Sequence, residues 1–138
     1  MRWSDPDMLG HVNHARYLTY FEDARMALVS ASPSGLSSDP ADRGAIAARV
    51  AVDYRRQVRF TAGLILTVRT TVSRIGTSSW TLRQLLFAPD DPARPVAEGE
   101  CVLVAFDYLA GKPRPLDDEE RAYWGALQPA DDRPAEQP

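Results

Sequence analysis

Several groups that could act on an acyl compound lie close together at the start of the chain, and they are Asp5, Asp7, His11, Asn13 and His14. They come just before a stretch with helical periodicity. The first turn of a helix leaves backbone N–H groups without intrahelical acceptors and carries a partial positive charge. A carboxylate held beside such a turn can act on a carbonyl group whose oxygen the N–H groups polarise. The segment therefore indicates acyl chemistry that needs neither a metal ion nor a Ser-His-Asp triad.

A helix is expected to position these groups. Asn13 is a good N-cap candidate, because its side-chain oxygen can accept a hydrogen bond from an N–H group of the first turn. Apolar residues then recur with the spacing of one helix face, at Tyr17, Phe21, Ala24 and Leu28. The Ser-, Pro- and Gly-containing segment 30–35 should end the helix. A long apolar helix early in a small chain is expected to pack against one sheet.

Alternating apolar and polar residues predict β-strands in the rest of the chain. The expected strands cover residues 46–60, 64–72, 79–87 and 96–106, with a short strand over 1–4. Turn-forming residues between them indicate hairpin connections. The fold class is therefore predicted to be α+β, with an antiparallel sheet wrapped round one long central helix.

The chain of 138 residues is long enough for one domain with its own core. We expect this domain to cover residues 1–127, with a short helix over about 117–124. Residues 128–138 are mainly Pro, Asp, Gln and Ala, and are expected to form a disordered tail.

The composition excludes several classes of function. A net charge of −3 lacks the basic surplus of nucleic-acid-binding proteins, so no nucleic-acid partner is expected. The single cysteine, Cys101, excludes an internal disulfide and a thiolate metal cluster, and its apolar surroundings predict a buried, inert thiol. No apolar run approaches the ~18 residues of a membrane span and no signal peptide follows Met1. We therefore expect a cytoplasmic protein without a membrane partner.

The histidines and carboxylates near the N-terminus could also suggest a metal site. However, they lack the spacing of zinc proteases, and the calcium-loop pattern fails at two positions. Leu9 stands where an oxygen ligand is needed, and Arg16 stands where a glutamate is needed. We therefore expect no metal ion and no cofactor.

The segment DPDMLGHVNHARY at 5–17, followed by YFEDAR at 20–25, resembles the signature of hotdog-fold acyl-CoA thioesterases of the 4-hydroxybenzoyl-CoA thioesterase type. Three later segments are also similar to this family: VDYRR at 52–56, RIGTSS at 74–79 and AEGE at 97–100. The resemblance implies a hotdog fold that hydrolyses an acyl-CoA thioester to free acid and CoA. It also implies a homodimer or homotetramer with the active site at the subunit interface.

The resemblance implies roles for particular residues. Asp7, the second carboxylate of the family's Asp-x-Asp, would be the catalytic group, acting as a general base or as a nucleophile. The backbone N–H of His14 would polarise the thioester carbonyl. The remaining substrate-binding residues are expected to be His11, Asn13, Tyr17, Ser78 and Ser79.

Other interpretations remain open at this point. Asp7 could simply cap a turn, whereas Asp5 is expected to have a structural hydrogen-bonding role. Glu22 could be a second carboxylate of the pocket, but an ion pair with Arg25 is expected more often. Four arginines are candidates for the CoA phosphates or are merely solvated, and they are Arg55, Arg56, Arg59 and Arg74.

Two alternative functions keep the same fold. The protein could bind or sense an acyl thioester without turning it over. It could also act as an enoyl-CoA hydratase, with His11 transferring a proton. The sequence leaves open the acyl group, the choice between CoA and acyl carrier protein, and dimer versus tetramer.

Overall fold

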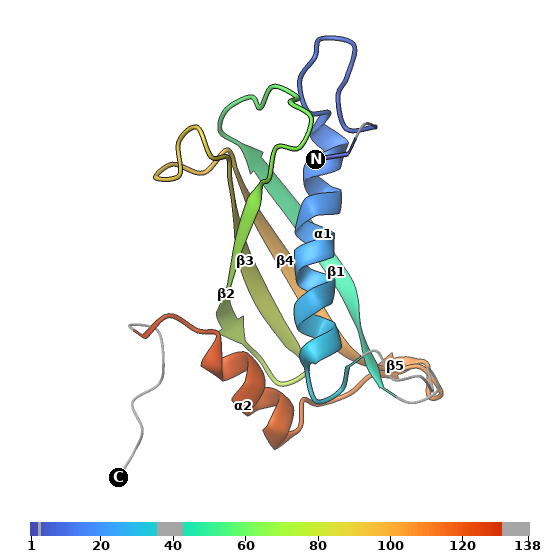
Figure 1. Cartoon of the computed structure of the whole chain (residues 1–138). Helices are drawn as coiled ribbons and strands as arrows, with labels where there is room; N and C mark the ends of the chain where they lie inside the picture. Colours follow the sequence, from blue (N-terminus) through green and yellow to red (C-terminus); the bar gives the residue numbers. More distant parts are fainter. Residues whose placement is uncertain (3, 36–42, 131–138) are drawn as a thin grey trace.

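The computed structural model describes residues 1–2, 4–35 and 43–130. Within these residues, the elements in chain order are α1 (His14–Ala31), β1 (Gly44–Tyr54), β2 (Thr67–Ile75), β3 (Ser79–Phe87), β4 (Ala97–Asp107), β5 (Lys112–Pro113) and α2 (Asp118–Ala126). The strands form one antiparallel sheet in the order β1–β4–β3–β2, and β5 pairs with the end of β4. The helix α1 runs across one face of the sheet, and α2 packs at the end of the sheet where α1 ends (Figure 1). The predicted α+β class with an antiparallel sheet is confirmed.

Both ends of α1 lie where the sequence predicted them. Asn13 has an extended backbone, and its Oδ1 accepts a hydrogen bond of 3.0 Å from the N–H of Ala15. At the other end, the N–H and the hydroxyl of Ser32 both donate to the carbonyl of Val29. The buried residues of α1 recur every four positions and are Tyr17, Phe21, Arg25 and Val29. A charged residue therefore occupies one position of the buried helix face.

The strand β1 is shorter and more exposed than expected. It ends at Tyr54 instead of residue 60, because the N–H groups of Arg55 and Arg56 both turn to the carbonyl of Val96. A bulge at Ala48 also breaks the alternation of the strand. Within the described part of the chain, β1 pairs only with β4 and forms one edge of the sheet. Three of its larger apolar side chains are exposed, and they are Ile46, Val50 and Tyr54.

The other elements follow the prediction more closely. The bounds of β3 are those expected, and β4 and α2 are each shifted by one or two residues. In contrast, β2 begins at Thr67 instead of residue 64. The predicted strand at 1–4 is absent from its described residues, and the amino group of Met1 instead donates to the carbonyl of Leu64. The predicted tail lies largely outside the described residues, which end at 130.

The core consists of two clusters along the sheet. One surrounds Trp80 and Trp124, whose rings stack with their centroids 4.7 Å apart. It contains Cys101, which is fully buried as predicted, and burial raises the pKa of its thiol. The other cluster contains Tyr17 and Phe21, near the start of α1. The second cluster therefore supports the segment that carries the candidate site.

Gly99 in β4 provides a test of how closely α1 packs on the sheet. A Cβ atom at this position would lie 3.1 Å from two ring carbons of Phe21, which is buried in the core. We expect Gly99→Ala to lower the free energy of unfolding by about 1–3 kcal/mol, because the tightly packed ring must move. Denaturant-induced unfolding measures this change.

Gly125→Ala is the matched control, because no atom lies within 4 Å of its added Cβ and the residue is in α2. This change should maintain stability or increase it by up to ~1 kcal/mol. Equal unfolding midpoints for Gly99→Ala and the unchanged protein would contradict the prediction.

Candidate functional site

Asp7 opens a tight turn that ends at His11. The N–H of Asp7 donates to the carbonyl of His11 over 2.8 Å, and Oδ1 of Asp7 accepts from the N–H groups of Leu9 (2.8 Å) and His11 (3.2 Å). Gly10 has a φ of 74° in this turn, a conformation that favours glycine. The carboxylate therefore caps the turn through Oδ1 only. Its Oδ2 has no hydrogen-bond partner among the described residues.

The carboxylate of Asp7 faces an open surface hollow. Asp7 is half-buried and lines the hollow together with Pro6, Met8, Leu9 and Asn13. Asn13 is the N-cap of α1, so the hollow reaches the start of the helix. The structure thus brings two of the predicted site residues, Asp7 and Asn13, to one place.

One backbone N–H group at the start of α1 has no acceptor among the described residues. The side chain of Asn13 accepts from Ala15, and its carbonyl accepts from Arg16 over 2.9 Å. The N–H of His14 has no acceptor among the described residues. The hydroxyl of Tyr54 donates to the carbonyl of His14 over 3.0 Å and so ties the helix start to β1. A free N–H is therefore held in a fixed position next to Asn13.

Asp5 has a different environment from Asp7. It is fully buried and accepts hydrogen bonds from the hydroxyl of Tyr20 and the N–H of Arg2, while Nε of Arg16 lies 3.9 Å away. Burial alone would raise the pKa of Asp5, but the hydrogen bonds and the positive charge lower it overall. Burial and the bond to Asp5 in turn raise the pKa of Tyr20. Of the two carboxylates, only Asp7 is open to a substrate.

Two other predicted residues lie elsewhere in the same region. The backbone of His11 pairs with that of Arg59, and His11 lines a second hollow of about 460 Å³ that also contains Arg56. Tyr17 is only 3% exposed and packs edge-on against the ring of Tyr54. Burial raises the pKa of the Tyr17 hydroxyl. Within one chain, Tyr17 therefore supports the helix start from inside the core.

Ser78 and Ser79 lie far from the Asp7 turn within one chain. Ser78 belongs to the connection between β2 and β3, and Ser79 is the first residue of β3. The carbonyl of Ser78 accepts from Ala105, and that of Ser79 accepts from Gly76. This connection lies at the end of the sheet beside α2, and the segment before α1 lies at the other end (Figure 1). Within one chain, these serines and the carboxylate of Asp7 therefore do not meet.

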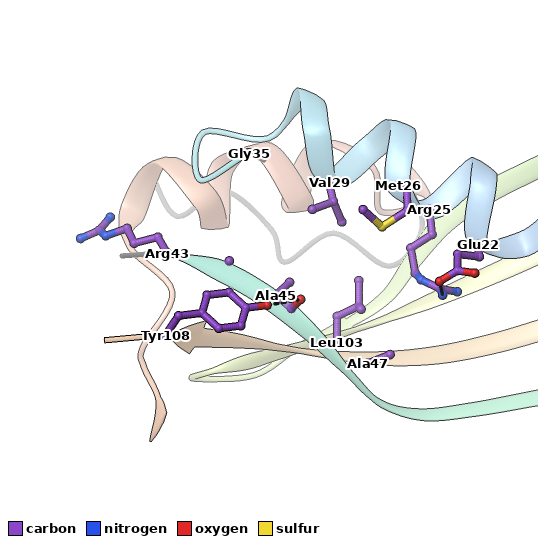
Figure 2. Close-up of a pocket in the computed structure, with 11 residues that line it drawn as sticks. Glu22, Arg25, Met26, Val29, Gly35, Arg43, Ala45, Ala47, Leu103 and Tyr108 are labelled. Carbon is purple, nitrogen blue, oxygen red and sulfur yellow. Dashed lines mark hydrogen bonds and ion pairs between the residues drawn. The ribbon is translucent and has the colours of Figure 1, made fainter. Parts of the chain in front are cut away.

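A cavity between α1 and β1 was not predicted from the sequence (Figure 2). It is lined in part by Glu22 and Arg25, whose predicted ion pair is confirmed with a distance of 3.9 Å. The signal that could have indicated it is the position of Arg25, four residues after Phe21 and four before Val29 on the buried helix face.

Two kinds of feature are absent from the described residues. No three His, Cys, Asp or Glu side chains in this part of the chain come together as potential metal ligands. No helix within it is both long and apolar enough to cross a membrane.

The antiparallel sheet with α1 across one face matches the hotdog fold of solved thioesterase structures. The chain belongs to the thioesterase-like superfamily, whose family model matches residues 1–124. Membership of this superfamily supports thioester hydrolysis as the general chemistry of the protein.

Individual relatives agree with this assignment. The uncharacterized protein YsmA of Bacillus subtilis (strain 168) is 31% identical over 121 residues, which cover 88% of this chain and 78% of that protein. A thioesterase from Thermus thermophilus, complexed with coenzyme A and Zn, is 32% identical with a TM-score of 0.72, over 90% of this chain and 91% of that one. A predicted thioesterase from Bacillus stearothermophilus is 28% identical with a TM-score of 0.80, over 94% of each chain.

Proposed function

We propose that this protein hydrolyses an acyl-CoA thioester to free acid and CoA, with Asp7 as the catalytic carboxylate. The observation that carries the proposal is that two polar groups near the start of α1 have no hydrogen-bond partner among the described residues. These groups are Oδ2 of Asp7 and the backbone N–H of His14, on either side of the N-cap Asn13. A similar thioesterase structure with coenzyme A bound supports CoA as the carrier of the acyl group.

In this mechanism, the thioester carbonyl oxygen accepts a hydrogen bond from the N–H of His14. Negative charge develops on that oxygen as the tetrahedral species forms, and the N–H and the helix dipole stabilise it. One such donor contributes on the order of 3 kcal/mol in other enzymes. Asp7 either removes a proton from the attacking water or attacks the carbonyl carbon itself to form a mixed anhydride. The thiolate of CoA is the leaving group in both routes.

The CoA part of the substrate would extend from the Asp7 carboxylate along the second hollow, which His11 lines. His11 and Arg59 line it, and Arg59 has no ion pair among the described residues, so it is available for the CoA phosphates. Arg56 is less available, because Asp90 accepts two hydrogen bonds from it at 2.7 and 3.0 Å. Within the superfamily, the protein would be of the 4-hydroxybenzoyl-CoA thioesterase type, which its segment 5–17 resembles.

The active protein would be a homodimer or homotetramer with the sheet wrapped round α1 in each subunit. The edge strand β1 favours this proposal, because one of its sides pairs with no strand of the described residues and three of its apolar residues are exposed. An interface along β1 would enclose the hollow beside Asp7. It would also offer Ser78 and Ser79 of the second subunit as substrate contacts. Light scattering would measure the oligomeric state.

A panel of acyl-CoA thioesters, with detection of the released thiol, tests the proposed reaction. We expect the protein to hydrolyse at least one aromatic or aliphatic acyl-CoA. The rate of thiol release should increase with the amount of enzyme. Saturable binding without thiol release across the whole panel would contradict the proposal and favour an acyl-thioester sensor. Hydration of an enoyl-CoA without hydrolysis would favour a hydratase instead.

A further inference from the structure

The cavity between α1 and β1 has the properties of a small-molecule site. Its volume is about 420 Å³, within the range of about 300–1,000 Å³ that is usual for such sites. Its walls are mainly apolar and include Met26, Val29, Ala45, Ala47 and Leu103. It lies along the C-terminal half of α1 (Figure 2). The Asp7 turn, in contrast, precedes the N-terminus of that helix. The cavity is therefore separate from the hollow beside Asp7 within one chain.

Arg25 places a guanidinium group with one unsatisfied donor in this apolar cavity. The residue is 7% exposed, and its buried Nη1 has no hydrogen-bond partner among the described residues. Figure 2 shows the side chain running from α1 toward the sheet, with its guanidinium group beside Glu22. The distance of 3.9 Å between Nη2 and Oε1 of Glu22 is too long for a hydrogen bond. The Glu22 side chain is also 61% exposed, so solvent screens its charge.

The other charged residue of the cavity is already paired. Arg43 lies at the far end and donates to Asp117 over 2.8 Å, with its side chain largely exposed. Among the described residues that line the cavity, Arg25 is thus the only cation that has a buried donor without an acceptor. A buried guanidinium N–H without an acceptor is unfavourable, and a carboxylate is its best-matched partner.

We propose that this cavity binds an aliphatic carboxylate. The carboxylate accepts a hydrogen bond from Nη1 of Arg25, and the hydrocarbon chain lies against Met26, Val29 and Leu103. The carboxylate belongs either to a free organic acid or to the far end of an acyl group that a second subunit holds at its own Asp7. This inference goes beyond the proposed function, because the binding itself requires no hydrolysis at Asp7.

Calorimetric titration of the full chain with hexanoate, and with neutral hexanamide of similar size, tests the site. We expect hexanoate to bind saturably and hexanamide to bind about tenfold or more weakly, since the amide lacks the charge that pairs with Arg25. Arg25→Gln should weaken hexanoate binding by a similar factor. Arg94→Gln should leave it nearly unchanged, because Arg94 is exposed, pairs with Asp91 and does not line the cavity.

Ala47→Leu provides a second test that keeps Arg25 intact. The larger side chain fills part of the cavity from β1 and should also weaken hexanoate binding by about tenfold or more. This variant decides the question if Arg25→Gln fails to fold. The inference is overturned if hexanoate does not bind saturably, if it binds no better than hexanamide, or if Ala47→Leu binds it normally.

A comparison of adipoyl-CoA with hexanoyl-CoA distinguishes the two sources of the carboxylate. A higher kcat/KM for adipoyl-CoA that disappears in Arg25→Gln would assign the site to the acyl group. Equal kcat/KM values together with hexanoate binding would assign it to a free acid. Hexanoate binding without any thioester hydrolysis would instead support the cavity site and contradict the proposed reaction.

Discussion

Replacing Asp7 with asparagine is expected to lower kcat for thioester hydrolysis by about 100-fold or more. The amide keeps the side-chain oxygen that accepts from the N–H groups of Leu9 and His11, so the turn should persist. It lacks the negative charge needed to remove a proton from water or to attack the carbonyl carbon, and such a group typically contributes 10²–10⁴-fold. Steady-state kinetics with the best substrate of the acyl-CoA panel measures the loss.

Substitutions of two other aspartates are the controls for the Asp7→Asn prediction. Asp118→Asn changes an exposed residue of α2 and should leave both kcat and stability nearly unchanged. Asp5→Asn should mainly lower the free energy of unfolding, because Tyr20 would lose a buried, charged hydrogen-bond acceptor. If Asp7→Asn and Asp7→Ala retain full turnover, Asp7 is not the catalytic carboxylate.

Glu120→Gln is expected to cause a large loss of stability, roughly 3 kcal/mol or more in the free energy of unfolding. Glu120 is fully buried and accepts two hydrogen bonds from Arg114, at 2.6 and 2.7 Å. It also accepts from the N–H of Asp117 and so completes the capping box of α2. The amide would leave the nearly buried guanidinium of Arg114 without its counter-charge. Denaturant-induced unfolding at neutral pH measures the effect.

The same carboxylate gives stability a defined pH dependence. Burial alone would raise the pKa of Glu120, but the hydrogen bonds from Arg114 and others lower it from 4.5 to about 2. Because the pKa is lower in the folded state, the contribution is fully present above about pH 4.5 and is lost as pH falls toward 2. The stability difference between the unchanged protein and Glu120→Gln should therefore shrink over this range. A difference that stays constant down to pH 2 would contradict this assignment.

Glu100→Gln is the matched control for this substitution. Glu100 pairs with Arg49, but both side chains are more than half exposed. Such pairs contribute about 0–1 kcal/mol, because water screens the charges. Glu100→Gln should therefore change stability little at any pH. If Glu100→Gln lowered the free energy of unfolding as much as Glu120→Gln does, burial would not explain the large effect expected at Glu120.

Local sequence determined the elements whose hydrogen bonds are made between near neighbours. The side chain of Asn13 bonds two residues along the chain and starts α1, and Ser32 bonds three residues back and ends it. The bounds of β3 also agree with its apolar alternation. The placement of Asp7 just before the helix start follows from the same local rules. These features could be predicted because each depends on a short segment of the chain.

Only the tertiary structure decided which of the candidate groups meet and which are buried. Asp5 and Asp7 are two residues apart, yet contact with Tyr20 buries the first while the second stays open at the surface. The early end of β1 depends on the carbonyl of Val96, some forty residues further along the chain. Arg25 faces a cavity because β1 and β4 pack opposite α1. Burial and pairing across such separations depend on contacts that no local pattern of residues encodes.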